Sequence, residues 1–167
     1  AQKTVAKWLK SAPNDIVIEL ALAESFSLIG QPEKVIPFYD QLIKKYRRVP
    51  LVLNNAANAY FIVGKKEEAH ALANEAYNKA GENVAVIDTL AWIESRQGNH
   101  AAALSLFRDA LVIDFNNPDI KYHLAMTLKK ENRDVEAKKT LIEVLNNDRE
   151  FSEREAAEAL LKEWQGR

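Results

Sequence analysis

The side chains of this sequence best suited to acid–base or metal chemistry are three histidines and a few carboxylates. The chain has three histidines, His70, His100 and His123, and they do not occupy equivalent positions of the 34-residue repeat described below. No His-x3-His or Glu-x2-His spacing places two ligands on one helix face. Asp88 and Glu24 share a face, but two repeat units separate them by about 20 Å, too far for the paired carboxylates of a glycosidase. There is no cysteine and no glycine-rich phosphate loop. The sequence therefore predicts no enzyme, no cofactor and no metal site.

The composition argues against a nucleic acid partner and against insertion into a membrane. The 167 residues are 47% hydrophobic and 28% charged, with a formal net charge of −1, as in an ordinary globular domain. A protein that mainly neutralises phosphates carries a basic excess, so we do not expect a nucleic acid partner. No apolar run approaches the roughly 20 residues of a membrane span, and we expect no direct membrane insertion by this chain. A cysteine-free chain suits reducing and oxidising compartments equally.

Residues of similar type recur every 34 positions along the chain. Gly30, Gly64 and Gly98 are followed at the next step by Asn132, and after glycine it is asparagine that most readily adopts positive φ. The repeat therefore predicts positive φ at four turns. Small residues recur seven positions before and five positions after these turns, where two helices would approach closely: Ala23, Ala57, Ala91 and Ala125 before, and Val35, Ala69, Ala103 and Ala137 after.

Each repeat has the pattern of two helices joined by a short turn. Apolar residues recur at helical spacing on both sides of Gly98, and the alternation typical of a β-strand is absent. Asn117 before Pro118 is a strong signal for a helix start. His100 opens the second helix of its unit, and we interpret it as a solvated residue rather than a ligand. The predicted complete units are residues 16–49, 50–83, 84–117 and 118–151.

This 34-residue hairpin resembles the tetratricopeptide repeat (TPR), whose pattern includes a large apolar residue, then Leu and a small residue, and later Ala-x3-Phe. The third complete unit has Leu90 before an alanine, and later Ala103 four residues before Phe107. It departs from the pattern at Glu94, where the first helix usually has an aromatic residue. The resemblance implies an all-α fold, a right-handed α-solenoid of TPR helical hairpins in a single domain over residues 1–167.

The two ends differ from the complete units. Residues 1–15 correspond to a second helix without its partner, so we expect a fragment of a longer array, with possible self-association through this truncated N-terminal helix and its Trp8. Residues 152–167 carry an apolar stripe beneath a charged face, which is typical of the capping helix that ends a solenoid. Ser152 and Glu155 have the spacing of a capping box.

A second resemblance concerns the source of the chain. The sequences of residues 88–92, DTLAW, and 116–125, NNPDIKYHLA, are similar to the C-terminal part of certain bacterial envelope TPR lipoproteins. Those lipoproteins are linked to exopolysaccharide and protein-sorting (exosortase, PEP-CTERM) systems. This resemblance implies the bacterial periplasm or cell envelope. The cytoplasm is the alternative, and the residues themselves leave the compartment open.

In the TPR family, the first helices of the hairpins line a concave groove that binds peptides or partner helices. Asn54 and Asn58, one turn apart, could hold a peptide backbone with paired amide hydrogen bonds. Trp92 offers adaptable apolar area for a partner or, alternatively, packs between neighbouring first helices. The candidate partner-binding residues on this face are Asn54, Asn58, Phe61, Asp88, Trp92, Arg96, Tyr122, Met126 and Lys129.

Two functions of different classes fit this pattern. The first is a non-catalytic scaffold that binds a protein or peptide segment of unknown identity in the groove, in bacterial exopolysaccharide or protein-sorting machinery if the second resemblance holds. The second is a structural spacer in a long envelope array with no specific groove ligand. A carboxylate clamp is not supported, because Leu20, Ala21 and Glu24 occupy the positions of its first ligands. The basic residues within 44–48 close a helix, where cations complement the helix dipole, and we interpret them as a solvated helix end.

Overall fold

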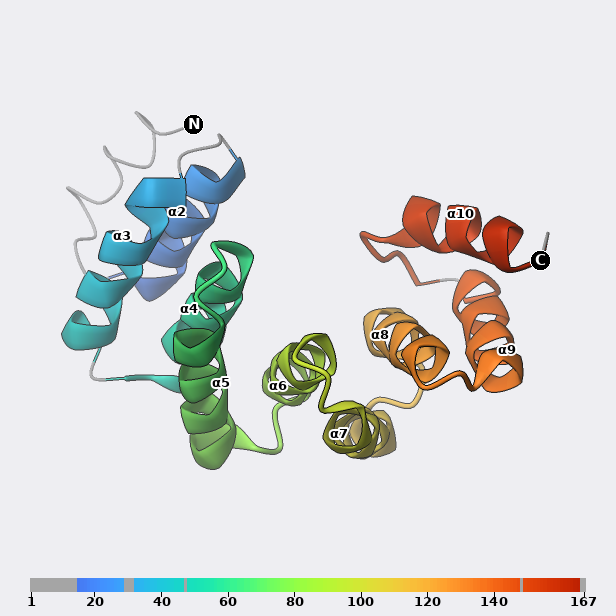
Figure 1. Ribbon diagram of the computed structural model, residues 1–167. Helices are drawn as coiled ribbons and strands as arrows, with labels where there is room; N and C mark the ends of the chain where they lie inside the picture. The colour runs from blue at the N-terminus through green and yellow to red at the C-terminus, as the bar shows by residue number, and fades with distance from the viewer. Residues whose placement is uncertain (1–14, 29–31, 47, 148, 166–167) are drawn as a thin grey trace. The chain divides into compact units, whose positions relative to one another are not determined.

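The computed structural model describes residues 15–28, 32–46, 48–147 and 149–165. This part of the chain forms nine α-helices and contains no β-strand (Figure 1). Contacts between Cα atoms divide the chain into two compact units, residues 1–80 and 81–167, and each unit is described by itself.

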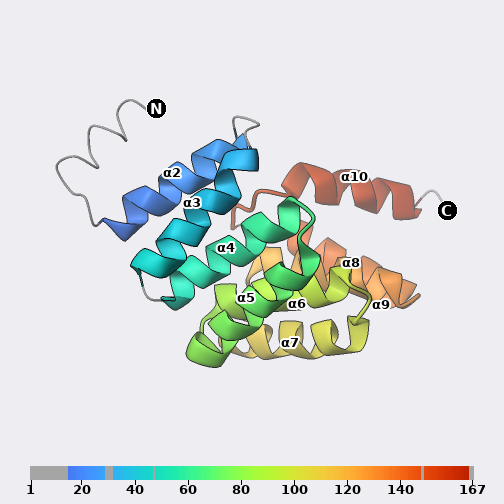
Figure 2. The same ribbon diagram turned by 60° about the vertical axis from the view of Figure 1, so that its left-hand side comes forward.

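The first unit contains two helical hairpins (Figure 2). In one, α2 (Ile16–Leu28) packs against α3 (Pro32–Lys45), and in the other, α4 (Pro50–Ile62) packs against α5 (Lys66–Ala80). Helix α4 also contacts both α3 and α2. The two hairpins of this unit are therefore stacked, with the first helix of the second hairpin against both helices of the first.

The second unit repeats this arrangement and adds one helix at its end. Helix α6 (Val84–Arg96) pairs with α7 (His100–Ile113), and α8 (Pro118–Lys130) pairs with α9 (Asp134–Leu145). Helix α8 also contacts α7 and α6. The last helix, α10 (Arg154–Gln165), packs against α9.

The helices follow the 34-residue spacing of the sequence. First helices begin at residues 16, 50, 84 and 118 and second helices at 32, 66, 100 and 134, so each start lies 34 residues after the previous one. All eight small residues at the predicted contact points are buried, with seven alanines at 0% and Val35 at 1% exposure. Helix axes pack 8–10 Å apart depending on the side chains at the contact, and alanine permits the closer approach. The predicted helical hairpins are confirmed.

The turns inside the hairpins have the predicted backbone conformation. Gly64, Gly98 and Asn132 have φ angles of 84°, 92° and 59°. After Gly98, the N–H of Asn99 donates to the carbonyl of Glu94 at 2.9 Å, and the N–H of Gly98 itself donates to Ser95, the pair of bonds that defines a Schellman motif. The same two bonds occur at the other two turns. Positive φ is thus confirmed at three positions, and Gly30 lies outside the described residues.

Side-chain caps fix the starts of the first helices in the second unit. Asn117 Oδ1 accepts hydrogen bonds from the N–H groups of Asp119 at 3.1 Å and Ile120 at 3.2 Å. Asn83 caps α6 in the same way. The start predicted at residue 117 is therefore confirmed, and an Asn cap contributes about 1 kcal/mol to helix stability.

Helix α10 caps the second unit by covering apolar residues of α8 and α9. Ala157 and Trp164 belong to clusters with Ala125 of α8 and Leu141 of α9. The predicted capping helix is confirmed. The capping box predicted at Ser152 is wrong, because its hydroxyl donates to the adjacent Glu153 carboxylate and α10 begins only at residue 154.

Two expectations about the extent of the array stay predictions. Residues 1–14, including Trp8, lie outside the described residues, so the truncated first repeat and its self-association are untested. The single domain over residues 1–167 is untested as well.

Candidate functional site

In the first unit, the candidate groove residues lie on α4 and differ in accessibility. Asn58 is exposed and Phe61 is half-buried, whereas Asn54 is only 7% exposed. The Asn54 Oδ1 atom is buried and has no hydrogen-bond partner in the described structure. An unsatisfied buried carbonyl costs about 1 to 3 kcal/mol. A peptide backbone held by both Asn54 and Asn58 would therefore have to contact the Asn54 carboxamide, which is nearly buried.

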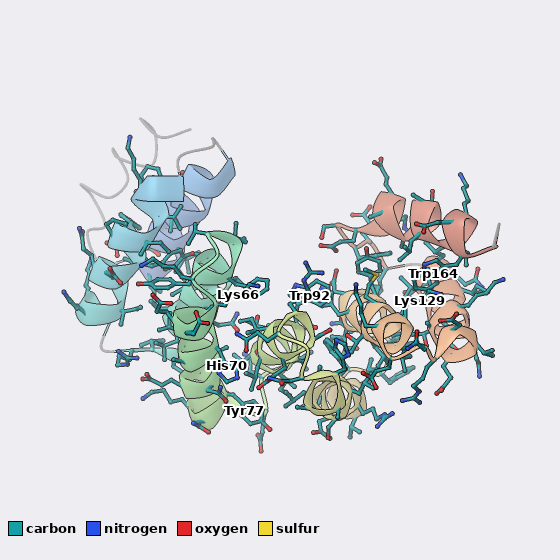
Figure 3. All side chains as sticks on the ribbon, in the orientation of Figure 1. Lys66, His70, Tyr77, Trp92, Lys129 and Trp164 are labelled. Carbon is teal, nitrogen blue, oxygen red and sulfur yellow. The ribbon has the colours of Figure 1, made fainter. Side chains whose placement is uncertain are left out.

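In the second unit, the candidate residues lie on the neighbouring helices α6 and α8. Trp92 is half-buried and stacks on His123 of α8, with ring centroids 4.3 Å apart and an interplanar angle of 24°. The Arg96 guanidinium lies over the same indole, 5.5 Å from its centroid. Trp92, labelled beside α6 in Figure 3, therefore packs between neighbouring first helices, as the alternative interpretation of the sequence proposed. It also lines the cavity described below.

His123 is a residue of this face that the sequence interpretation missed. Its Nδ1 atom lies 2.8 Å from Oδ1 of Asp88, and the two side chains are 16% and 19% exposed. Burial lowers the pKa of His123, but the hydrogen bond and charge of Asp88, aided by Glu153 and Asp119, outweigh burial and raise the pKa above its ordinary value. The repeat could have indicated this position, because His123 lies one 34-residue step after the buried Thr89 and therefore on the packed side of its helix.

Carboxylates gather near the N-terminal ends of α6 and α8. Burial raises the pKa of Asp119, and the nearby charges of Glu153 and Asp88 raise it further. Burial and Glu153 also raise the pKa of the Tyr122 hydroxyl. Tyr122 packs against Phe151, which precedes α10, with ring centroids 6.1 Å apart. This end of the α6–α8 face is therefore acidic, and the segment before α10 partly covers it.

The C-terminal ends of the same two helices are basic and surround a cavity of about 410 Å³. Arg96 ends α6 and Lys130 ends α8, and neither side chain has an ion pair among the described residues. His100 also lines the cavity, with its Nδ1 atom 2.6 Å from Glu131 Oε1. The lining residues are Trp92, Ser95, Arg96, Gln97, Gly98, His100, Met126 and Lys130.

Lys129, which the sequence interpretation placed in the groove, is engaged in the packing of the second unit. Its ammonium group lies 3.0 Å from the Asp134 carboxylate and 5.4 Å from the centroid of the Trp164 ring, beside which Figure 3 shows it. Lys130 lines the cavity instead. A strict 34-residue step from Arg96 leads to Lys130, so the repeat itself contained the better candidate.

Within the described ranges, no group of three or more His, Asp or Glu side chains is arranged to hold a metal ion. None of the helices described is both long enough and apolar enough to cross a membrane. The face combines the half-buried indole of Trp92, the thioether of Met126 and the guanidinium of Arg96, side chains of types that are enriched at protein interfaces.

Comparison with known proteins identifies the repeat. The model of the tetratricopeptide repeat family matches residues 95–162, which include the cavity residues from Ser95 onward. No curated protein sequence matches the chain.

Solved structures share the fold over nearly the whole chain. A thermophilic TPR protein of Thermus thermophilus superposes with a TM-score of 0.78 at 17% identity, over 89% of this chain and 82% of the other. The PilF protein of Pseudomonas aeruginosa superposes with a TM-score of 0.73 at 21% identity, over 99% and 75%. YrrB, described as a TPR protein with an unusual peptide-binding site, gives 0.66 at 17% identity, over 99% and 86%.

These results define a protein built of helical-hairpin repeats, with the predicted α-solenoid fold. Residues 95–162 match the tetratricopeptide repeat family model, and the described chain as a whole has the fold of TPR proteins. Proteins of this fold generally act as scaffolds for protein–protein interaction rather than as enzymes.

Proposed function

We propose that the chain is a non-catalytic scaffold that binds a segment of a partner protein on the face formed by α6 and α8. The observation that carries the proposal is the cavity of about 410 Å³ between the C-terminal ends of these helices, lined by Trp92 and Met126. A half-buried indole whose position is fixed by packing before binding is a typical anchor for a partner.

A non-catalytic role is part of this proposal. His123, which stacks on the indole, is hydrogen-bonded to Asp88, and both side chains are largely buried, which suits a structural pair. The sequences of residues 88–92 and 116–125 resemble bacterial envelope TPR lipoproteins. This resemblance supports a narrower proposal, in which the partner belongs to bacterial envelope machinery for exopolysaccharide or protein sorting.

Site-specific photo-crosslinking in source cells tests the proposal. A photoreactive amino acid such as p-benzoyl-phenylalanine replaces Met126, which lines the cavity, or Val135 of α9, which is 84% exposed and serves as the control. We expect a crosslinked partner from position 126 and none from position 135. Crosslinks from position 135 alone would place the functional surface on the second helices.

The competing function, a structural spacer, predicts a different outcome of the same experiment. A spacer without a groove ligand gives no specific crosslink at either position, although the variants are expressed and folded. That outcome would overturn the proposed scaffold role.

A further inference from the structure

The cavity between α6 and α8 combines an apolar wall with uncompensated positive charge. Trp92 and Met126 form the apolar part, while Arg96 and Lys130 stand at its edge at the helix ends. Both cations are exposed and neither has an acidic partner among the described residues. His100, which also lines the cavity, is hydrogen-bonded to Glu131.

The absence of acidic partners distinguishes these two cations from Lys121, Lys129, Arg133 and Arg149 of the same unit. Lys129 pairs with Asp134, Arg133 with Glu136, and Arg149 with Asp114. Cations at helix C-termini also complement the helix dipole, which explains why Arg and Lys stand at these ends. The dipole does not explain a cavity between the two ends with an indole and a thioether in its wall.

Resting on the proposed function, we propose that this cavity binds a partner segment in which an aspartate or glutamate lies next to an apolar residue. The apolar side chain packs against Trp92 and Met126, and the carboxylate lies between the Arg96 guanidinium and the Lys130 ammonium. Arginine already positioned over an indole loses little rotamer freedom when it pairs with a carboxylate. Complementary charge selects the partner, and apolar contact supplies most of the affinity.

Selection from a random peptide library tests this chemistry without a known partner. The folded chain is immobilised and selects from a library of displayed dodecapeptides. We expect selected sequences in which Asp or Glu lies within three residues of Phe, Leu, Ile or Met. A selected peptide is then synthesised and titrated calorimetrically, together with its matched forms in which Asp is replaced by Asn or the apolar residue by Ser.

Charge reversal supplies the decisive variants. Arg96→Glu/Lys130→Glu should weaken binding of the acidic peptide by about 10-fold or more, the effect of replacing two attractive contacts with two repulsive ones. The neutral variant Arg96→Gln/Lys130→Gln should weaken it less. The matched control Arg108→Glu/Lys139→Glu makes the same charge change at exposed positions of α7 and α9, and it should bind like the parent. Circular dichroism confirms that each variant is folded.

The outcomes separate this inference from the proposed function. Selected peptides that lose binding on Trp92→Ala but not on Arg96→Gln/Lys130→Gln would overturn the acidic motif and leave the scaffold role intact. Peptides whose binding is unaffected by Trp92→Ala, or no selected peptides at all, would overturn both.

Discussion

At the scale of single residues, the packing interpretation and the partner-binding interpretation of Trp92 are compatible. One face of the indole stacks on His123, and the ring also lines an open cavity together with Met126. Stacking fixes the rotamer of the indole, and a fixed aromatic side chain loses little entropy when a partner binds. The same contact therefore serves the fold of the second unit and the proposed binding face.

Replacing Trp92 with Ala should affect both properties. We expect partner or selected-peptide affinity to fall by about 1 to 3 kcal/mol, the usual effect at an interface anchor. The free energy of unfolding should fall too, by at least the 0.5 to 1.5 kcal/mol of an aromatic pair. Calorimetric titration and denaturant unfolding measure the two losses separately. Unchanged binding by a folded, destabilised variant would leave Trp92 with a packing role alone.

The Asp88–His123 hydrogen bond should make stability depend on pH. Because the pKa of folded His123 is raised, protonated His123 favours the folded state. This stabilisation is fully present below the unfolded pKa of about 6.5, and it is lost as the pH rises through the higher folded pKa. Asp119 and Glu153, which also face His123, act in the same direction.

Asp88→Asn tests this linkage. The parent should exceed the variant in unfolding free energy by about 1.5 to 3 kcal/mol at acidic pH, the contribution of a hydrogen bond to a charged group, with a smaller difference at alkaline pH. Urea unfolding at several values between pH 5.5 and 9 measures the difference. A gap that stays constant over this range, or grows with pH, would contradict the assignment.

At the scale of elements, the repeat spacing predicted the turns because they depend on local backbone conformation. Gly64, Gly98 and Asn132 have positive φ, which the residue type alone indicates. Arg48 also has positive φ, at 61°, and the residue type did not indicate this, because arginine does not favour that region. Its side chain pairs with Glu75 of α5, a contact between residues distant in sequence.

The candidate site was less predictable, because its details depend on contacts between helices. Helical spacing identified Trp92 and Met126, but it could not show that Lys129 is held by Trp164 and Asp134. The burial of Asn54 likewise depends on tertiary packing rather than on helical phase within α4. Helical spacing predicts the direction in which a side chain leaves its own helix. Packing against neighbouring helices determines whether that side chain is accessible to a partner.

Gly98→Val should destabilise the second unit through φ alone. A Cβ atom at Gly98 would meet no heavy atom within 4 Å, so steric contact with neighbouring groups contributes nothing. The φ of 92° is nevertheless strained for a β-branched residue, and we expect a loss of about 1 to 3 kcal/mol. Gly98→Asn should cost less, because Asn132 occupies the equivalent turn. Thermal unfolding of both variants measures the order, and equal melting temperatures for parent and Gly98→Val would refute it.

Removing the Trp164 side chain should loosen the end of the second unit. The ring packs against the clusters around Leu141 and Leu128, but it is only partly buried, so Trp164→Ala should cost about 1 to 3 kcal/mol, below the range for a fully buried tryptophan. Hydrogen exchange should become faster in α8 and α9. Exchange that is unchanged in both helices would show that α10 contributes little to their stability.

At the scale of the whole molecule, the chain consists of two compact units, each with its own buried residues. In repeat proteins, stability is approximately the sum of terms within repeats and between neighbouring repeats. We therefore expect residues 81–167 alone to form helices that unfold cooperatively and to keep the Asp88–His123 pH dependence. Circular dichroism and urea titration test this, and a noncooperative or unfolded fragment would show that the second unit depends on the first.

The charges at the two ends of the α6–α8 face have a consequence for the geometry of any complex. Asp88 and Arg96 stand eight residues apart on α6, about 12 Å along its axis, and Asp119 and Lys130 repeat the same order on α8. An extended segment covers that distance in about four residues. A proposed partner segment that carries an acidic and a basic residue about four positions apart meets opposite charges at both ends of the face in only one direction. Complexes with such a segment should therefore all form with the same polarity.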